Sequence, residues 1–273
     1  MARKSDRNPA WIVGVGAMKG GAGKTMVSVN VAACLSEEAR VLVVDVDPQC
    51  NASSALGIDI ADPDIGTIVD VLSDHRTDPA DVVVESPVGS LPNLDVLPSA
   101  IKLFLTEFEL AYKAGRERLL YHYIGDNAEF FSRYDYIIID TNPGLGVANQ
   151  NAFFAADSII LATDVSDNGL TGIEMFQYLW GDVLCGEMRI PDRTRAIVVS
   201  NYDKRIGLAP QLLDYIKSRD DMEPLLVEPV VPYRVAYKDT EVDKLPINVR
   251  HPGSEAHQTI SRLIDSLKEK GAL

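Results

Sequence analysis

A short glycine-rich stretch between an apolar run and a helix-forming segment constrains the fold of this chain most. The apolar run Trp11–Val15 is followed by Met18–Thr25, which matches the pattern G-x-x-x-x-G-K-[ST] at Gly23, Lys24 and Thr25 and has Met18 at its first position. Glycines let successive backbone N–H groups point at phosphate oxygens, and the N-terminus of the next helix adds a positive dipole. The stretch therefore predicts a phosphate-binding loop, in which Lys24 reaches the β- and γ-phosphates of a nucleotide and Thr25 ligates Mg²⁺.

Two other apolar runs end in carboxylates. One run leads into Asp45 and Asp47, and a second leads into Asp140. Such runs predict buried parallel strands, whose carboxyl ends lie at the edge where open α/β sheets bind ligands. Four apolar residues followed by Asp is the arrangement whose carboxylate holds the Mg²⁺ shell of a nucleotide. Taken alone, the first pair would also fit an acidic turn that Pro48 interrupts.

The rest of the chain alternates between strand and helix patterns. We expect strands at 11–15, 41–45, 82–84, 94–97, 136–140, 158–163, 196–200 and 225–231, and helices at 24–36, 67–72, 101–123, 147–156, 170–184, 209–218 and 254–270. This alternation predicts an α/β fold, with a mainly parallel central sheet and helices on both faces. We expect a flexible N-terminal segment, residues 1–10, and a single P-loop ATPase domain over 11–273.

Composition and cysteine usage exclude several classes of protein. The 273 residues are 46% hydrophobic, yet the chain has no apolar run long enough to span a membrane and no apolar signal segment at its start. We therefore expect a cytoplasmic protein. Its cysteines, Cys34, Cys50 and Cys185, are scattered without metal-ligand spacing, which indicates reduced thiols. Cys34 is expected to be packed, whereas Cys50 is either packed or a reactive thiol.

The charge of the chain is unevenly distributed. Residues 187–273 hold 14 basic and 14 acidic side chains, so the whole net charge of −14 lies in residues 1–186. A chain with this net charge is repelled by DNA at long range unless a basic patch is segregated on one face. The last third of the chain is the part in which such a patch could be built.

The loop carries an additional lysine at its start, Lys19. The stretch 19–25 resembles the deviant Walker A motif, KGGxGK[ST], of the ParA/MinD superfamily, and residues 45–51 resemble the DxDPQxN switch of its ParA branch. The resemblance runs from about residue 11 to 269 and implies a P-loop NTPase fold. It implies that Lys19 reaches the partner's nucleotide in an ATP sandwich dimer. Without the resemblance, Lys19 would be a surface lysine beside the phosphate loop.

The resemblance also assigns the other site residues. It implies that Asp47 positions the attacking water, that Asp45 supports Mg²⁺ and the loop geometry, and that Asp140 holds the Mg²⁺ shell. The catalytic set is then Lys19, Asp47 and Asp140, and the metal set is Thr25, Asp45, Asp47 and Asp140. The nucleotide-binding set is Lys19, Gly20, Gly21, Ala22, Gly23, Lys24, Thr25, Met26, Asn201 and Pro232.

Some positions depart from the family pattern or leave a simpler interpretation open. Met26 stands where the family has a second Thr, and Asn142 stands where it has Pro. Asn201 and Pro232 fall where the family contacts adenine, although Asn201 would also fit a loop cap. The glycines at 144 and 146 suit a mobile loop that senses the γ-phosphate.

DNA-binding residues are implied by the same resemblance. Arg205 falls on a DNA-contacting arginine of the family, but the second such arginine falls on Ala236. Arg234 and Lys238 lie near that position and could replace it. The alternative is that these charges are solvated side chains beside an active site.

The resemblance is to the short, Soj-like form, which lacks an N-terminal helix-turn-helix. It implies a partition ATPase with ATP and Mg²⁺ as cofactors, which dimerises on ATP, binds nucleoid DNA without sequence preference and is released when a ParB-like or adaptor protein stimulates hydrolysis. The cargo would be a plasmid, a chromosome, or a protein body such as a carboxysome or chemoreceptor cluster. A MinD-like membrane ATPase would need an amphipathic helix, for which the stripe Ile260, Leu263, Ile264 and Leu267 is the candidate. An Fe–S carrier is disfavoured by the cysteine spacing, and a non-enzymatic scaffold by Asp47 and Asp140.

Overall fold

Six parallel strands form one sheet across the molecule. The computed structural model describes residues 10–273. The expected flexible N-terminal segment, residues 1–10, therefore lies outside the described residues except for Ala10. The strands are β1 (Trp11–Gly16), β2 (Val41–Val46), β3 (Leu94–Leu97), β4 (Tyr136–Thr141), β5 (Ser158–Asp164) and β6 (Thr194–Ser200). They lie in the order β3-β2-β4-β1-β5-β6, and every pairing is parallel. The predicted α/β class is confirmed.

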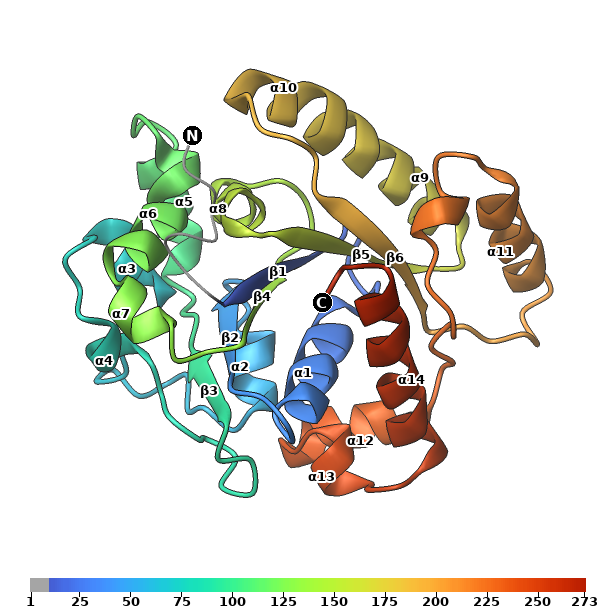
Figure 1. Cartoon of the computed structure of the whole chain (residues 1–273), viewed down its shortest axis with the longest axis horizontal. Coiled ribbons are helices and arrows are strands. Elements are labelled where there is room, and N and C mark those ends of the chain that lie inside the picture. The colour runs from blue at the N-terminus through green and yellow to red at the C-terminus, as the bar shows by residue number, and fades with distance from the viewer. Residues whose placement is uncertain (1–9) are drawn as a thin grey trace.

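Helices cover both faces of the sheet (Figure 1). One face is covered by α1 (Lys24–Leu35), α2 (Asn51–Ala55), α12 (Val235–Asp243), α13 (Ile247–Arg250) and α14 (Glu255–Glu269). The other is covered by α3 (Ile68–Ser73), α4 (Pro79–Val82), α5 (Leu103–Leu110), α6 (Leu119–Asp126), α7 (Ala128–Phe131), α8 (Val147–Ala155), α9 (Asp167–Phe176), α10 (Cys185–Met188) and α11 (Ala209–Ser218). Short turns of other helix types are η2 (Arg116–Arg118), the π-helix η3 (Gln177–Leu184) and η4 (Glu223–Leu225).

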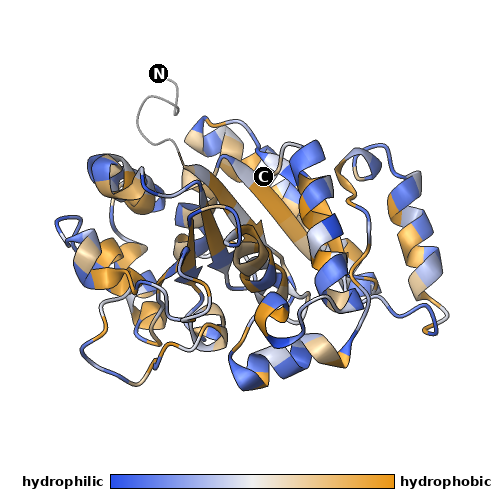
Figure 2. Cartoon of the chain, turned by 60° about the horizontal axis from the view of Figure 1, so that its bottom comes forward, coloured by the Kyte–Doolittle hydropathy of each residue, from blue (hydrophilic) through white to orange (hydrophobic). Residues whose placement is uncertain are grey.

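Strand residues alternate between the two cores. On β4, Ile137 and Ile139 face the α8 side, whereas Ile138 faces the α1 side. Figure 2 shows the resulting apolar sheet enclosed by helices of mixed hydropathy. At Gly16 a side chain would be excluded, because a Cβ there would lie 2.6 Å from the Phe153 ring. This close approach lets α8 lie directly on β1.

Three expectations for local structure are wrong. Residues 82–84 form no strand, because Asp78 caps a short helix that Pro79 begins, and only Val84 makes an isolated bridge. Residues 101–123 are not one helix, because the chain turns at Gly115, whose φ is 68°. Residues 225–231 make only isolated ladder contacts with β6, since the prolines of this stretch cannot donate to a ladder.

The C-terminal helix α14 docks on the core, as expected. Its apolar stripe, which includes Ile260 and Leu263, is buried in the core on the α1 side. Ser254 caps the helix by accepting a hydrogen bond from the backbone N–H of His257. Within residues 10–273, no helix has the length and apolar character to cross a membrane.

Candidate functional site

The phosphate loop leaves β1 and enters α1 at the carboxyl edge of the sheet. Gly21 and Gly23 have φ values of 78° and 77°, which only glycine adopts without strain. A Cβ at Gly23 would also lie 2.3 Å from the Ser200 hydroxyl oxygen. That hydroxyl donates a 2.7 Å hydrogen bond to the carbonyl of Ala22, so the end of β6 holds the loop in place.

Lys24 is the first residue of α1 and is buried. Burial lowers the pKa of its ammonium group, and the carboxylates of Asp140 and Asp47 partly offset this effect. A buried cation at a helix N-terminus beside a glycine-rich loop makes a concentrated positive site. It fits a phosphate group, which would supply the missing negative charge.

Asp140 lies beneath the loop at the end of β4. Its two carboxylate oxygens accept hydrogen bonds of 2.8 Å from the Thr25 hydroxyl and 2.7 Å from the Ser28 hydroxyl. Burial raises the pKa of Asp140 to about 6, against the lowering effect of both hydroxyls. The contact between Thr25 and Asp140 brings together two of the predicted metal ligands.

Both carboxylate oxygens of Asp45 accept hydrogen bonds. One of its oxygens accepts from the backbone N–H of Asp47, and the other accepts from the N–H and hydroxyl of Ser53. Burial raises the pKa of Asp45 to about 7, and the charge of Asp140, its register partner on β4, adds to this rise. The side chain thus ties the switch loop to Ser53 of α2.

Asp47 lies at the edge of a cleft beside the phosphate loop. Its carboxylate accepts a 2.8 Å hydrogen bond from the N–H of Gln49, and the Asn51 amide lies 3.4 Å from its other oxygen. The cleft has a volume of about 530 Å³. It is lined by Gly20, Gly21, Gly23, Lys24, Thr25, Met26, Asp47, Gln49, Asn51, Ser54, Ala55, Pro143, Asn201, Tyr233, Arg234, Tyr237, Lys238 and Glu241.

Of the two predicted adenine contacts, Asn201 lines this cleft, whereas Pro232 does not. Asn201 lines it with a left-handed backbone, and its side-chain amide donates a 3.1 Å hydrogen bond to the carbonyl of Gly21. Pro232 is half-buried and bridges to Tyr202, and the neighbouring Tyr233 lines the cleft. Asn201 therefore supports the phosphate loop through Gly21.

Lys19 points away from the cleft. Its ammonium group lies 2.5 Å from a carboxylate oxygen of Asp164 and 3.0 Å from the Ser166 hydroxyl. Asp164 ends β5, and Ser166 caps α9 by accepting from the N–H of Gly169. Within one chain, Lys19 is therefore bound to the start of α9.

The three predicted DNA-binding residues make different contacts within the chain. Arg205 is exposed and makes a fork of hydrogen bonds with Asp203. Arg234 pairs with Glu255, and Lys238 lies 5.4 Å from the centre of the Tyr233 ring. Arg234 and Lys238 line the nucleotide cleft, whereas Arg205 lies outside it.

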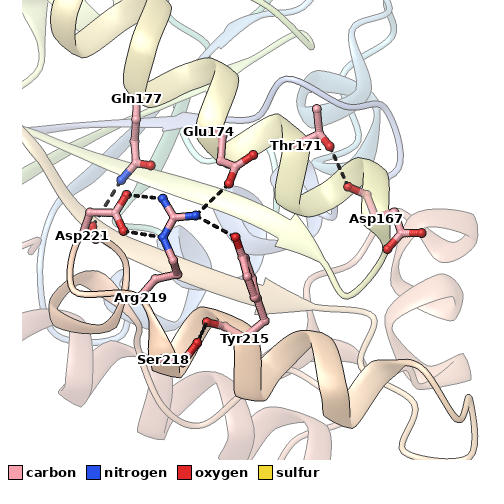
Figure 3. A network of polar contacts seen from close by, with 8 residues as sticks. All are labelled: Asp167, Thr171, Glu174, Gln177, Tyr215, Ser218, Arg219 and Asp221. Carbon is pink, nitrogen blue, oxygen red and sulfur yellow. Dashed lines mark hydrogen bonds and ion pairs between the residues drawn. The ribbon is translucent and has the colours of Figure 1, made fainter.

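A polar network fixes the helix after the Arg205 loop against α9 (Figure 3). Arg219, just beyond α11, contacts both oxygens of Asp221 at 2.9 Å and Glu174 of α9 at 2.9 Å. The Tyr215 hydroxyl accepts from the same guanidinium. The network thus joins α11 to the helix whose start holds Lys19.

Cys50 behaves as a packed side chain. It is buried, and burial raises the pKa of its thiol to about 11. A thiol of high pKa contains little thiolate, which is the nucleophilic form. Of the two interpretations, the structure favours packing.

The sequence analysis did not identify two residues of the site, Ser28 and Asn149. Ser28 lies one helical turn after Lys24, so the spacing of four could have identified it as a second hydroxyl on the same face. Asn149 donates to the carbonyls of Asn142 and Gly144 and so shapes the loop after Asp140. No local signal distinguishes that asparagine. Among residues 10–273, no three His, Cys, Asp or Glu side chains form a cluster that could hold a metal ion.

Comparisons with known proteins agree with this geometry. Residues 10–182 match the family model described as an AAA domain. The sporulation initiation inhibitor protein Soj of Bacillus subtilis is 31% identical over 96% of this chain and 98% of its own length. The chromosome partitioning protein ParA of Myxococcus xanthus is 32% identical over 92% of this chain and 86% of its own. A solved structure of apo McdA from Cyanothece superposes with a TM-score of 0.80 at 19% identity, over 96% of this chain and 99% of that one.

Proposed function

Since the chain belongs to the ParA/MinD superfamily of P-loop ATPases, we propose that it hydrolyses ATP to ADP and phosphate and uses this reaction to position cargo on nucleoid DNA. The observation that carries the proposal is the set of contacts around Asp140. A buried lysine, a hydroxyl on the carboxylate and a glycine cradle meet at one cleft, which is the arrangement that holds a Mg²⁺-nucleotide.

Each side chain has a defined task in this proposal. Lys24 neutralises the β- and γ-phosphates, while Thr25 and Asp140 hold Mg²⁺, which supplies charge neutralisation when bound. Asp47 accepts a hydrogen bond from the attacking water at the cleft. Asp45 holds the loop that carries Asp47 by accepting a hydrogen bond from the Asp47 backbone N–H. Asn201 and Pro232 contact the base.

ATP would also join two copies of the chain. Lys19 would leave Asp164 and reach the nucleotide of the second copy, so the dimer forms only with ATP. The dimer would bind DNA through exposed arginines such as Arg205, and a ParB-like or adaptor partner would stimulate slow hydrolysis and release it. Arg234 and Lys238 are proposed to contribute to DNA binding from the rim of the cleft, where they also contact nucleotide.

The cargo would be plasmid or chromosome DNA. A protein body is the second candidate, and the observation that points beyond DNA cargo is the 30% identity to a relative named as a cell division protein, PomZ of Myxococcus xanthus. A MinD-like membrane role is disfavoured because the α14 stripe is buried.

Phosphate release by the purified chain tests the proposal. We expect slow release with ATP and Mg²⁺, loss of release without Mg²⁺, and an increase of molecular mass in light scattering when a hydrolysis-resistant ATP analogue is added. A chain that binds no ATP would contradict the proposal.

A further inference from the structure

The carboxylate of Asp140 is held at both of its oxygens by hydroxyl groups of one helix. The Thr25 hydroxyl donates a 2.8 Å hydrogen bond to one oxygen, and the Ser28 hydroxyl donates a 2.7 Å hydrogen bond to the other. Both donors belong to α1 and stand at i and i+3, so they project from the same face of the helix. The plane of the carboxylate is therefore fixed relative to the helix that follows the phosphate loop.

The proton of the Ser28 hydroxyl has two acceptors within reach. One is Asp140, and the other is the backbone carbonyl of Lys24 at 3.0 Å. That carbonyl lies one helical turn back, where it is the regular acceptor of the Ser28 backbone N–H. Asp140 is nearer, and a charged acceptor makes the stronger hydrogen bond. Because a hydroxyl has a single proton, we assign this proton to Asp140.

The contact lies in a part of the core that excludes water. Ser28, Asp140 and Asp45, which is the register partner of Asp140 on β2, are all 0% exposed. Burial raises the pKa of Asp140, and the hydrogen bond from Ser28 opposes this rise more than the one from Thr25 does. Removal of the Ser28 hydroxyl would thus leave a buried carboxylate oxygen without this donor.

The two hydroxyls differ in what they can reach. Thr25 lines the nucleotide cleft, whereas Ser28 does not and is fully buried. Ser28 therefore cannot touch a nucleotide or its Mg²⁺, and it can affect them only through Asp140. Residues that orient a metal ligand from behind commonly change metal affinity by about 10- to 100-fold when they are replaced.

We propose that Ser28 is a positioning residue, which orients the Asp140 carboxylate for the Mg²⁺ of the bound nucleotide. Thr25 has to serve both Asp140 and the metal, whereas Ser28 serves Asp140 alone. Ser28 is thus the contact that keeps the carboxylate oriented while Thr25 ligates the ion. The inference rests on the proposed function, because it takes Asp140 to hold the Mg²⁺ of ATP.

The Mg²⁺ dependence of nucleotide binding tests the inference. A fluorescent, hydrolysis-resistant ATP analogue is titrated into wild type and Ser28→Ala at a series of Mg²⁺ concentrations and in EDTA. We expect the half-saturating Mg²⁺ concentration to rise by about tenfold or more in Ser28→Ala. Affinity for the analogue in EDTA should stay within about twofold of wild type, because Lys24 and the glycine loop contact phosphate without the metal. A merely structural defect would weaken binding under both conditions.

Two variants serve as controls for the lost hydroxyl. Ser36→Ala removes another buried serine hydroxyl, at the end of α1, which donates to the carbonyl of Ala33 and not to Asp140. Its Mg²⁺ dependence should equal that of wild type. Ser28→Cys keeps a side chain of similar shape with a weak donor, so its half-saturating Mg²⁺ concentration should lie between those of wild type and Ser28→Ala.

Urea unfolding without nucleotide tests the contact itself. Ser28→Ala, Asp140→Ala and the double variant form a cycle, and their effects on the unfolding free energy should not add, because each change removes the same hydrogen bond. Additive effects, or wild-type Mg²⁺ dependence in Ser28→Ala, would overturn the inference and leave the proposed function standing. Equal binding of the analogue by wild type with Mg²⁺ and in EDTA would instead contradict the proposed Mg²⁺ site, and the inference with it.

Discussion

The ammonium group of Lys19 lies 2.5 Å from the carboxylate of Asp164, which ends the neighbouring strand β5. The two residues are far apart in sequence, and Ser166 completes the contact. A lysine held in this way is not available to a second subunit. The ion pair therefore opposes the cross-subunit role proposed for Lys19, and its strength affects how readily the ATP dimer forms.

Changes at this pair should move dimerisation in opposite directions. Asp164→Asn weakens the contact. Because an exposed ion pair contributes about 0.2–1 kcal/mol and each of the two subunits would release one, the dimer should form at up to about thirtyfold lower protein concentration. Lys19→Ala should prevent dimerisation or hydrolysis while nucleotide binding by the monomer persists. Light scattering at several protein concentrations with a hydrolysis-resistant ATP analogue measures both effects.

The double variant Lys19→Ala/Asp164→Asn is the control for this pair. If Asp164 acts only through Lys19, the double variant should behave like Lys19→Ala alone. A Lys19→Ala protein that dimerises and hydrolyses normally would show that Lys19 is a bystander.

Lys24→Ala should abolish ATP binding. The variant loses a charge-assisted contact to phosphate in a buried site, so affinity should fall by about a hundredfold or more. The exposed Lys102→Ala serves as control and should bind ATP like wild type. Isothermal titration decides the outcome, and wild-type affinity in Lys24→Ala would refute the assignment of the phosphate site.

Asp47→Ala should bind ATP but not turn it over. The cradle of Gly21, Gly23 and Lys24 is independent of Asp47, whereas positioning of water is lost. The expected product is a dimer that persists with ATP, seen in light scattering over the time in which the wild-type dimer decays. Unchanged phosphate release would transfer the catalytic role to another residue.

The nucleotide-free protein should lose stability as the pH rises from about 4 to about 7. The pKa values of Asp45 and Asp140 are raised by burial to about 7 and about 6, so the folded chain binds more protons than the unfolded chain in this window. Asp140→Asn removes one of these groups and should give a shallower dependence of the unfolding free energy on pH. Urea unfolding at several pH values measures it.

The exposed Asp126→Asn is the control for the pH experiment. It removes a carboxylate of the same type without touching the buried pair, so its pH dependence should follow wild type. An equal slope in Asp140→Asn and wild type would mean that Asp140 is ionised in the folded chain throughout this range.

The phosphate loop and the acidic strand ends could be predicted because their information is local. Gly23, Lys24 and Thr25 must be adjacent to wrap a phosphate, and Asp140 must follow its strand directly. Each signal is therefore contained in a few consecutive residues. The same holds for α14, whose apolar stripe and Ser254 cap lie within one segment.

Contacts between distant segments could not be predicted. The pairing of Lys19 with Asp164 depends on the order of β1 and β5 in the sheet, which the sequence does not state. The placement of Arg234 and Lys238 in the cleft depends on α12, whose residues show little separation of apolar and polar faces. The exposure of Phe104 follows from which face of α5 the core uses.

Arg205 should be needed for DNA binding by the ATP dimer. The net charge of the chain is −14, so attraction to DNA must come from a local patch and should fall steeply with salt. Arg205→Glu should eliminate binding without changing phosphate release measured in the absence of DNA. The matched control is Arg76→Glu, because Arg76 is equally exposed and makes the same fork with an aspartate two residues earlier, Asp74. Mobility shifts at several salt concentrations with a hydrolysis-resistant ATP analogue measure the effect.

A milder change, Arg205→Ala, should remove one phosphate contact. The slope of the logarithm of the DNA-binding constant against the logarithm of the salt concentration should then fall by about one in magnitude. If the mobility shifts of Arg205→Glu and wild type coincide, Arg205 lies outside the DNA interface. If wild type binds no DNA, the proposed positioning of cargo on nucleoid DNA is wrong, and Ala236, which stands where the family has its second DNA-contacting arginine, is the position at which a contact is missing.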